Sequence, residues 1–200
     1  MAGLRERKKE QTRRRIAEVA LRLFAERGFD AVTINEIAEA AEVAKVTLFK
    51  YFPTKESLVL QGVGEEDLAG IVAARPPGQS PLEALRAHYR AFATEPVVVA
   101  AVDRDALITQ MRVIFDSPAL SSGANDLLYG QRQALARVLA EEHDELTAAL
   151  MAAQITASVL TLQERFFRHL VDGASLEEAG RHLVEDVELA FDLLRHGINH

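Results

Sequence analysis

The chain has 200 residues, of which 48% are hydrophobic and 26% charged, with a formal net charge of -7 at pH 7, a composition typical of a globular protein rather than a disordered one. The absence of cysteine excludes disulfide bonds and cysteine-containing metal sites. No apolar stretch follows the charged start MAGLRERKKEQTRRR, so we expect no secretory signal and a cytoplasmic protein.

Charged residues are unevenly distributed along the chain. Residues 1–60 carry 12 Lys and Arg against 9 Asp and Glu, a net +3, which leaves 11 against 21, or -10, for residues 61–200. Because affinity for phosphate depends on local cationic patches, the acidic total does not exclude a nucleic-acid partner for the first part. The distribution predicts two functions in one chain, a basic N-terminal part and a larger acidic body.

The apolar residues predict helices throughout, since no sustained alternation of apolar and polar residues occurs. In the first predicted helix one face is apolar, formed by Ile16, Val19, Ala20, Leu23 and Phe24. Thr12 is expected to cap the start of this helix, and Gly28 to supply the left-handed residue after its end. Phe29 is expected to fold back on the last turn.

A second, short helix is predicted in the stretch TINEIAEAA. Thr33 stands at its N-terminal capping position and Glu36 follows three residues later, which is the spacing of a capping box. Ile34, Ile37 and Ala38 form its apolar face. Glu42 and Val43 then predict a tight turn before the next helix.

The third predicted helix runs from about residue 44 to residue 51, with Leu48 and Phe52 as its buried positions. The side chains expected to face outward are those of Lys45, Val46, Thr47, Phe49, Lys50 and Tyr51. Two short helices joined by a tight turn and supported by a preceding helix predict a helix-turn-helix unit, whose second helix enters the major groove of DNA. After Pro53, a fourth helix is expected to begin at Lys55, where a helix N-terminus with a lysine binds anions.

The stretch from residue 12 to 58, which includes FAERGFDAVTINEIAEAAEVAKVTLFKYFPTKESL, resembles the DNA-binding domain of the TetR family of bacterial transcriptional regulators. The Gly-Phe turn, the Thr-x-x-x-Ile-Ala helix, the Thr-Leu-aromatic-x-Tyr-Phe helix and the Lys-Glu-x-Leu segment occur in the family's order. The resemblance implies double-stranded DNA as a partner, with phosphate contacts from Thr33, Thr47, Tyr51 and Lys55 and base-edge contacts from Ala44, Lys45 and Val46. Basic residues from Arg5 to Arg15 are candidates for further phosphate or minor-groove contacts.

Three residues depart from the family's pattern. Glu42 stands where the turn usually has glycine, which costs about 1–2 kcal/mol if the residue is left-handed. Ala44 replaces a capping serine or threonine, and Phe49 replaces a tyrosine whose hydroxyl contacts the DNA backbone. These departures leave open an alternative, a protein-binding module that has kept the fold and lost DNA binding.

The expected fold is all-α, with a DNA-binding domain at residues 1–54 and a larger helical body at residues 55–200. The fourth helix is expected to run from Lys55 toward Ala74, before the loop ARPPGQSP. Further helices are predicted near residues 81–94, 97–115, 118–142, 144–171 and 175–196. The resemblance implies that this body binds a small molecule and forms a homodimer through its last two helices.

The final predicted helix has an unusually wide apolar face. Its stripe contains Leu176, Ala179, Leu183, Val184, Val187, Ala190, Phe191 and Leu194, and Leu189 and Leu193 widen it to roughly 200° at 100° per residue. One neighbouring helix needs only about half of that arc. The surplus favours a helix that packs on its own core and on a partner subunit, although a second helix of the same chain is an alternative cover.

The helix near 144–171 contains 18 uncharged residues between Glu145 and Glu164. Its six Thr, Ser and Gln residues argue against a membrane span, so we expect a helix buried on most sides in a soluble body. A polar stripe at Gln154, Ser158 and Thr161 predicts an effector pocket, and the opposite side, with Ala148, Ala152 and Val159, is expected to face the dimer partner. The aromatic residues expected to complete the pocket are Tyr89, Phe92, Phe115 and Tyr129. A thin solvent-facing edge is the alternative interpretation of the stripe.

An enzyme is the second functional hypothesis, and the motifs argue against it. The sequence has no Gly-x-Ser-x-Gly, no phosphate-binding loop and no cysteine nucleophile. Its six histidines lack metal-ligand spacing, so we expect neither a metal nor a cofactor. We therefore predict a ligand-responsive DNA-binding regulator, a repressor that binds a palindromic operator as a homodimer and is released by a small molecule.

Overall fold

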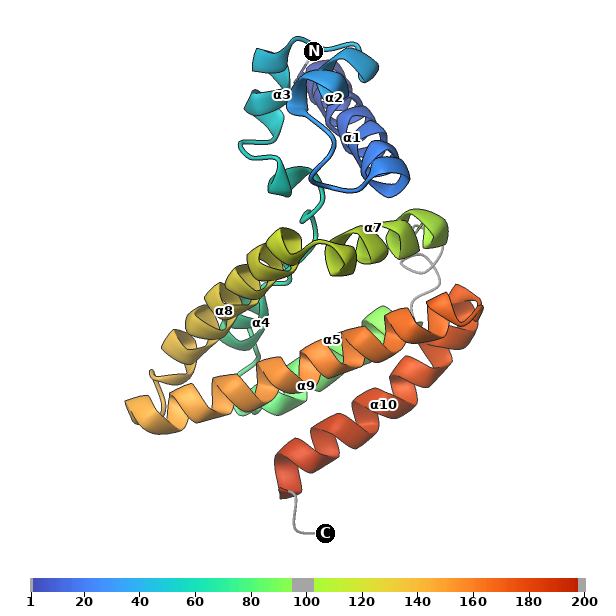
Figure 1. The fold of residues 1–200 in the computed structure, drawn as a ribbon. Coiled ribbons are helices and arrows are strands. Elements are labelled where there is room, and N and C mark those ends of the chain that lie inside the picture. The colour runs from blue at the N-terminus through green and yellow to red at the C-terminus, as the bar shows by residue number, and fades with distance from the viewer. Residues whose placement is uncertain (1, 95–102, 198–200) are drawn as a thin grey trace. The chain divides into compact units, whose positions relative to one another are not determined.

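The structure is a computed structural model, and it describes residues 2–94 and 103–197 (Figure 1). Every regular element in these two ranges is a helix, in agreement with the predicted all-α class. The chain forms two compact units. The first contains residues from 1–63 and 109–126, and the second contains residues from 64–108 and 127–200. The compact units therefore divide the chain differently from the predicted division after residue 54.

The first unit begins with helix α1, Ala2–Arg27. Ile16, Ala20 and Phe24 are buried, as the apolar periodicity predicts. Gly28 follows with φ 82, and the Phe29 ring returns to within 5.0 Å of the Phe24 ring centroid, so both predictions for this end are confirmed.

The predicted start of α1 is wrong, because the helix begins ten residues before Thr12. The Thr12 hydroxyl donates to the Lys8 carbonyl oxygen at 2.9 Å inside the helix, instead of capping it. Such a bond satisfies a threonine in a helix interior. The Arg, Lys, Glu and Gln residues before Thr12 are good helix formers, so they extend the helix.

Helix α2, Ile34–Ala40, begins with the predicted capping box. The Thr33 hydroxyl accepts from the Glu36 backbone N–H at 3.3 Å, and the Glu36 carboxylate accepts from the Thr33 N–H at 2.8 Å. Arg27 of α1 lies 2.8 Å from the same carboxylate. The hydrogen bonds from Thr33, with a smaller contribution from Arg27, lower the pKa of Glu36 from 4.5 to about 2.

This lowered pKa predicts a pH dependence of stability. A carboxyl group with a depressed folded-state pKa stabilises the fold above its unfolded pKa, here 4.5, and this contribution is lost as pH falls toward about 2. Glu36→Gln keeps an acceptor for the Thr33 N–H but does not titrate. We expect the melting temperature of the variant to fall less than that of the wild type over this range, as measured by circular dichroism.

Glu39→Gln is the matched control, because Glu39 is an exposed residue of the same helix. It should leave the acid profile of the wild type unchanged. Parallel acid profiles for Glu36→Gln and wild type would contradict the prediction.

The predicted fourth helix from Lys55 to Ala74 is not continuous. A short 3-10 helix, η1, covers Glu56–Leu58, and α4 covers only Leu68–Ala73. Between them, Gly62 has φ 80 and Gly64 has φ 66, conformations that end a right-handed helix. The Asp67 side chain then caps α4 by accepting from the Gly70 N–H at 2.8 Å.

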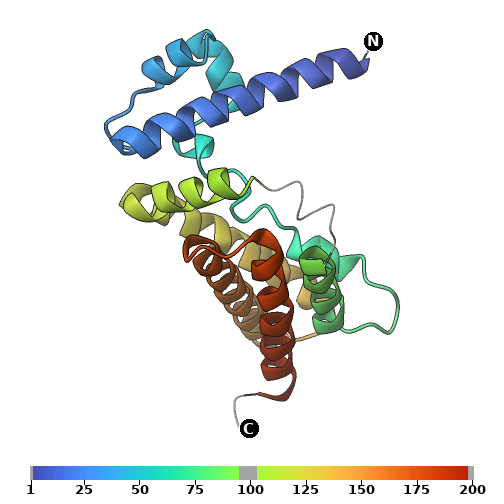
Figure 2. The same ribbon diagram turned by 90° about the vertical axis from the view of Figure 1, so that its right-hand side faces the viewer.

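The remaining helices are α5 (Pro81–Thr94), α7 (Arg104–Asp116), α8 (Pro118–Leu139), α9 (Glu145–Val171) and α10 (Leu176–His196). They match the predicted ranges to within a few residues, except that the start of the helix predicted at 97–115 lies outside the described residues. Helix α10 packs against both α5 and α9 in the second unit, which Figure 2 shows from a second side. Its core includes Leu85, Tyr89, Leu135, Ile155, Val187 and Phe191.

Helix α9 is the one helix in the described ranges that is long and apolar enough to cross a membrane by composition alone. Ala148, Ala152 and Val159 on one of its sides are buried in the core of the second unit. The prediction that this side faces a dimer partner is therefore wrong. Small side chains permit close packing on a helix of the same chain as readily as on a partner, so the sequence pattern could not distinguish the two.

Candidate nucleic-acid interface

Helix α3, Lys45–Tyr51, is held in place by its two predicted apolar anchors. Leu48 is 0% exposed and Phe52, which follows the helix, is 1% exposed. Both belong to the core that α1 and α2 form. The opposite side of α3 is left to solvent, so this helix can present side chains to a groove of DNA.

The outward residues of α3 lie mostly where the sequence predicts them. Ala44, Lys45, Val46, Phe49 and Lys50 are exposed. Thr47 and Tyr51 are half-buried at the edges of the exposed side. Tyr51 packs against the core of the first unit. Thr33 is exposed at the start of α2.

The turn between α2 and α3 contains a strained residue. Glu42 has φ 53, the one positive φ at a non-glycine residue among those described, as expected from its place in the turn. The Val43 N–H donates to the Ala38 carbonyl oxygen at 2.9 Å, which closes the end of α2. The Glu42 carboxylate lies 3.6 Å from an Arg15 guanidinium nitrogen, and both side chains are largely exposed. The ion pair is therefore weak compared with the cost of the backbone conformation.

Glu42→Gly is expected to stabilise the first unit by about 1 kcal/mol, because glycine adopts positive φ without a steric penalty. The greater freedom of glycine in the unfolded chain offsets part of the gain. Thermal denaturation followed by circular dichroism measures the effect. Glu39→Gly, at an exposed position in α2, should instead lower the melting temperature. A Glu42→Gly protein that melts at or below the wild-type temperature would contradict the expectation.

The N-terminus of α3 has no side-chain cap. Ala44 occupies the capping position, and the backbone N–H groups of Thr47 and Leu48 both donate to its carbonyl oxygen, at 2.8 and 3.1 Å. The side chain of Ala44 can neither accept a hydrogen bond from the helix nor donate one to DNA. The groups that the first turn of α3 exposes for contact are consequently Lys45, Val46 and the backbone.

Lys55 is placed differently from the prediction. Its ammonium group donates to the Phe29 carbonyl oxygen at 2.6 Å and lies 4.3 Å from the Phe29 ring centroid. Since η1 replaces the expected helix, the predicted anion site at a helix N-terminus is absent here. Lys55 joins the segment after α3 to the end of α1, and any phosphate contact would compete with this bond.

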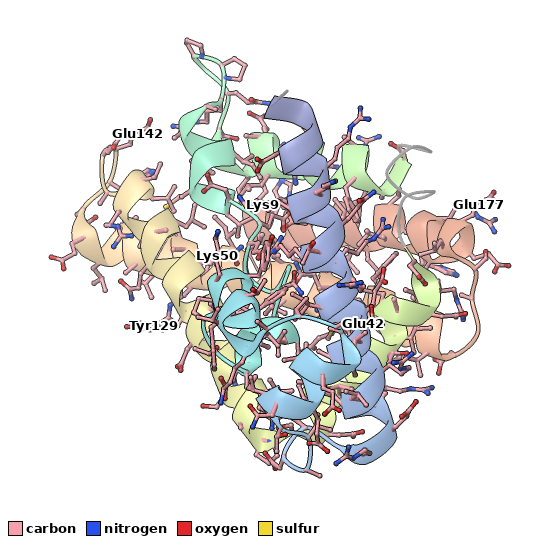
Figure 3. All side chains as sticks on the ribbon, turned by 90° about the horizontal axis from the view of Figure 1, so that it is seen from above. Lys9, Glu42, Lys50, Tyr129, Glu142 and Glu177 are labelled. Atoms are coloured by element: carbon pink, nitrogen blue, oxygen red, sulfur yellow. The ribbon has the colours of Figure 1, made fainter. Side chains whose placement is uncertain are left out.

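The N-terminal part of α1, before its first buried residue Ile16, is rich in basic residues. Residues 5–15 contain seven Arg or Lys and two Glu, and all described side chains from residue 6 to 11 are exposed. Arg13 lies 5.6 Å from the Phe52 ring centroid, which places this part of α1 next to the end of α3. Seen from above in Figure 3, Lys9 of α1 and Lys50 of α3 both lie on the side turned to the viewer. The exposed face of α3 therefore has a cationic neighbour.

Comparison with known proteins agrees with this geometry. The family model for bacterial regulatory proteins of the tetR family matches residues 16–61, the segment that contains the buried part of α1, α2, α3 and η1. Through this segment the chain is similar to the tetR family of bacterial regulatory proteins.

Two curated relatives illustrate how far the similarity extends. The transcriptional regulator TcmR of Streptomyces glaucescens is 34% identical over 122 residues, which cover 59% of this chain and 54% of TcmR, so the alignment spans about half of that relative. The putative mycofactocin biosynthesis regulator MftR of Mycobacterium tuberculosis is 27% identical over 195 residues, 96% of this chain and 94% of MftR.

Solved structures of the TetR family share the fold. FadR of Thermus thermophilus, solved in complex with lauroyl-CoA, has a TM-score of 0.51 and 26% identity, covering 94% of this chain and 95% of FadR. NalD, the secondary repressor of a multidrug efflux pump in Pseudomonas aeruginosa, has a TM-score of 0.55 and 18% identity, covering 92% of this chain and 97% of NalD. The NalD similarity concerns the fold alone.

Most of the residues that the sequence pattern selects for an effector pocket lie at the surface of the single chain. Gln154 and Thr161 are exposed on α9, and Ser158 is half-buried beside them. The Thr161 hydroxyl donates to the Ala157 carbonyl oxygen, as on an ordinary helix surface. Of the four predicted aromatic residues, only Tyr89 is buried, whereas Phe92, Phe115 and Tyr129 are 40%, 63% and 56% exposed. In the single chain the stripe is therefore exposed, as the alternative interpretation expects.

Neither of two hollows in the described part of the second unit is lined by the predicted pocket residues. The larger, about 710 Å³, lies between the loop at residues 75–81 and the end of α8. The smaller, about 370 Å³, lies between Gly64–Ala69 and α8, where Leu127, Gly130, Gln131 and Ala134 line it. Both are open grooves rather than enclosed cavities.

A polar cluster beside the smaller hollow was not predicted from the sequence. The Glu66 carboxylate accepts a hydrogen bond from the Tyr89 hydroxyl and lies 2.8 Å from His88 Nε2. Gln131 donates to the Glu66 carbonyl oxygen at 2.6 Å. Burial, reinforced by the neighbouring Glu66 carboxylate, raises the pKa of the Tyr89 hydroxyl above its usual value. The cluster fixes the segment before α4 to α5 and α8.

Proposed function

We propose that this protein is a DNA-binding transcriptional regulator that acts in the cytoplasm as a repressor. The observation that carries the proposal is the exposed side of α3, with Lys45, Val46, Phe49 and Lys50 outward and Leu48 and Phe52 buried beneath. This is the arrangement by which the second helix of a helix-turn-helix enters a major groove. The names of these curated relatives describe transcriptional regulators or repressors, which supports the same function. None of these names describes an enzyme.

The proposed contacts divide into two kinds. Lys45 and Val46 face base edges, whereas Thr33, Thr47, Tyr51 and Lys50 contact phosphates on either side of the groove. Phe49 supplies apolar contact between the two lysines. Lys55 is assigned mainly to holding the domain together, since its ammonium group is bound to Phe29.

A homodimer is part of the proposal, and α9 and α10 support it. Leu146 and Leu150 on α9 are 68% and 53% exposed, and Leu189 and Leu193 on α10 are 62% and 41% exposed. At 100° per residue each pair lies within about 40° on its helix, so the two pairs form apolar stripes. Burial of such stripes against the same stripes of a second copy gives two-fold symmetry, and a two-fold dimer requires a palindromic operator.

Release by a small molecule completes the proposal. FadR of Thermus thermophilus was solved with lauroyl-CoA, so an acyl-CoA is the first effector class to test. An effector bound to the second unit would change the separation of the two recognition helices, and a palindromic site tolerates only one separation. The effector residues predicted from the sequence are not part of this proposal, because they line neither of the two hollows described above.

Electrophoretic mobility shift with DNA flanking the protein's own gene tests the proposal. We expect a retarded complex that survives competition by unrelated DNA, and its loss when lauroyl-CoA is added. Glu177→Gln, an exposed change on α10, is a control that should behave as wild type. Failure to bind any flanking or randomised duplex above the non-specific level would overturn the DNA-binding function, whereas binding that no acyl-CoA changes would overturn only the effector class.

A further inference from the structure

Val46 is the most exposed large apolar side chain among the described residues, at 79%. It lies on a helix of seven residues in which Leu48 is completely buried and Phe49 is 40% exposed. At 100° per residue, Val46 and Phe49 occupy the middle of the exposed arc, with Lys45 and Lys50 at its two borders. The exposed side of α3 is therefore an apolar centre flanked by two cations.

The first turn of α3 has few groups that can recognise a base. Ala44 and Val46 carry no side-chain donor or acceptor, and Thr47 is half-buried at the edge of the arc. Lys45 is consequently the one exposed side chain of this turn that can donate a hydrogen bond to a base edge. Val46 can discriminate between bases only by apolar contact.

The major groove presents one apolar group that differs between base pairs, the C5-methyl group of thymine. We propose that Val46 selects thymine at one position of each operator half-site by packing its isopropyl group against this methyl. The inference rests on the proposed DNA-binding function and adds a base identity to it. Lys45, whose ammonium lies 6.0 Å from the Phe49 ring centroid, then donates to the neighbouring base pair.

Replacement of thymine by deoxyuridine tests the assignment, since uracil lacks only the methyl group. Duplexes enriched by the wild-type protein from a randomised library would be resynthesised with each thymine replaced in turn, and affinity measured by fluorescence anisotropy. We expect one thymine per half-site whose replacement weakens wild-type binding about fourfold, the effect of one buried methyl group. Val46→Ala should bind the thymine duplex more weakly and bind the thymine and uracil duplexes equally.

Lys50→Ala is the matched control on the same face of α3. It should weaken binding to both duplexes and keep the full preference for thymine. Because Val46 is exposed, Val46→Ala should melt at the wild-type temperature, so a loss of preference cannot come from unfolding.

The outcomes separate the two proposals. Enrichment of a site at which no thymine replacement matters, or a preference for thymine that persists in Val46→Ala, overturns the assignment of Val46 and leaves the DNA-binding function intact. A wild-type protein that enriches no sequence overturns both.

Discussion

Leu189→Lys combined with Leu193→Lys is expected to convert the protein from dimer to monomer and to weaken operator binding by about 100-fold or more. Both side chains are exposed on α10, so the lysines should not disturb the fold of one chain. Four lysines would meet at a two-fold interface, where like charges and lost apolar contact oppose association. A monomer contacts one half-site, so its affinity should approach the non-specific level, which is typically 10³-fold or more weaker.

Sedimentation equilibrium measures the dimer, and fluorescence anisotropy with a selected duplex measures DNA affinity. Tyr129→Lys is the control, because Tyr129 is 56% exposed on α8, outside the two helices. It should stay dimeric and bind as wild type. A double lysine variant that sediments as a dimer would show that another surface joins the subunits.

The helix-turn-helix was predictable because its signals are local. Thr33 and Glu36 form a capping box from residues three apart, and Gly28 ends α1 with a conformation that glycine adopts readily. Even the left-handed Glu42 follows from its place in the turn. Each of these signals depends only on residues within one or two helical turns, so it can be recognised from the sequence alone.

The break between η1 and α4 depends on contacts distant in sequence. Gly64 has φ 66, and a Cβ atom on it would lie 3.2 Å from the Leu127 Cβ atom of α8. Glu66 bonds His88 and Tyr89, 22 and 23 residues away, and Gln131, 65 residues away. No periodic pattern within one segment contains such pairings, and the sequence therefore predicted a continuous helix.

The orientation of α9 was predicted wrongly for a different reason. With 18 uncharged residues between Glu145 and Glu164, no charged residue marks the side of the helix that faces solvent. The polar stripe at Gln154 and Thr161 fits a pocket and a solvent edge equally well by spacing. The orientation of the helix depends on its packing. Ala148 and Ala152 are buried in the core of the second unit, so the polar stripe on the other side faces outward.

Leu48→Ala is expected to destabilise the first unit by about 3 kcal/mol and to abolish specific DNA binding. Leu48 is fully buried among residues of α1, α2 and α3, and truncation of a buried leucine both removes apolar contact and leaves a cavity. The core of this small unit has few residues to close the cavity, and α3 has only Leu48 and Phe52 as its main anchors.

Denaturant unfolding followed by circular dichroism measures the loss, and anisotropy with a selected duplex measures binding. Val46→Ala is the matched control, since it shortens an apolar side chain on the same helix at 79% exposure instead of 0%. The control should keep wild-type stability while Leu48→Ala loses it, because the free energy depends on area removed from water and not on residue type. Equal stability of the two variants would mean that α3 is not held by the core as described, and the proposed groove-facing side of the helix would have to be reassigned.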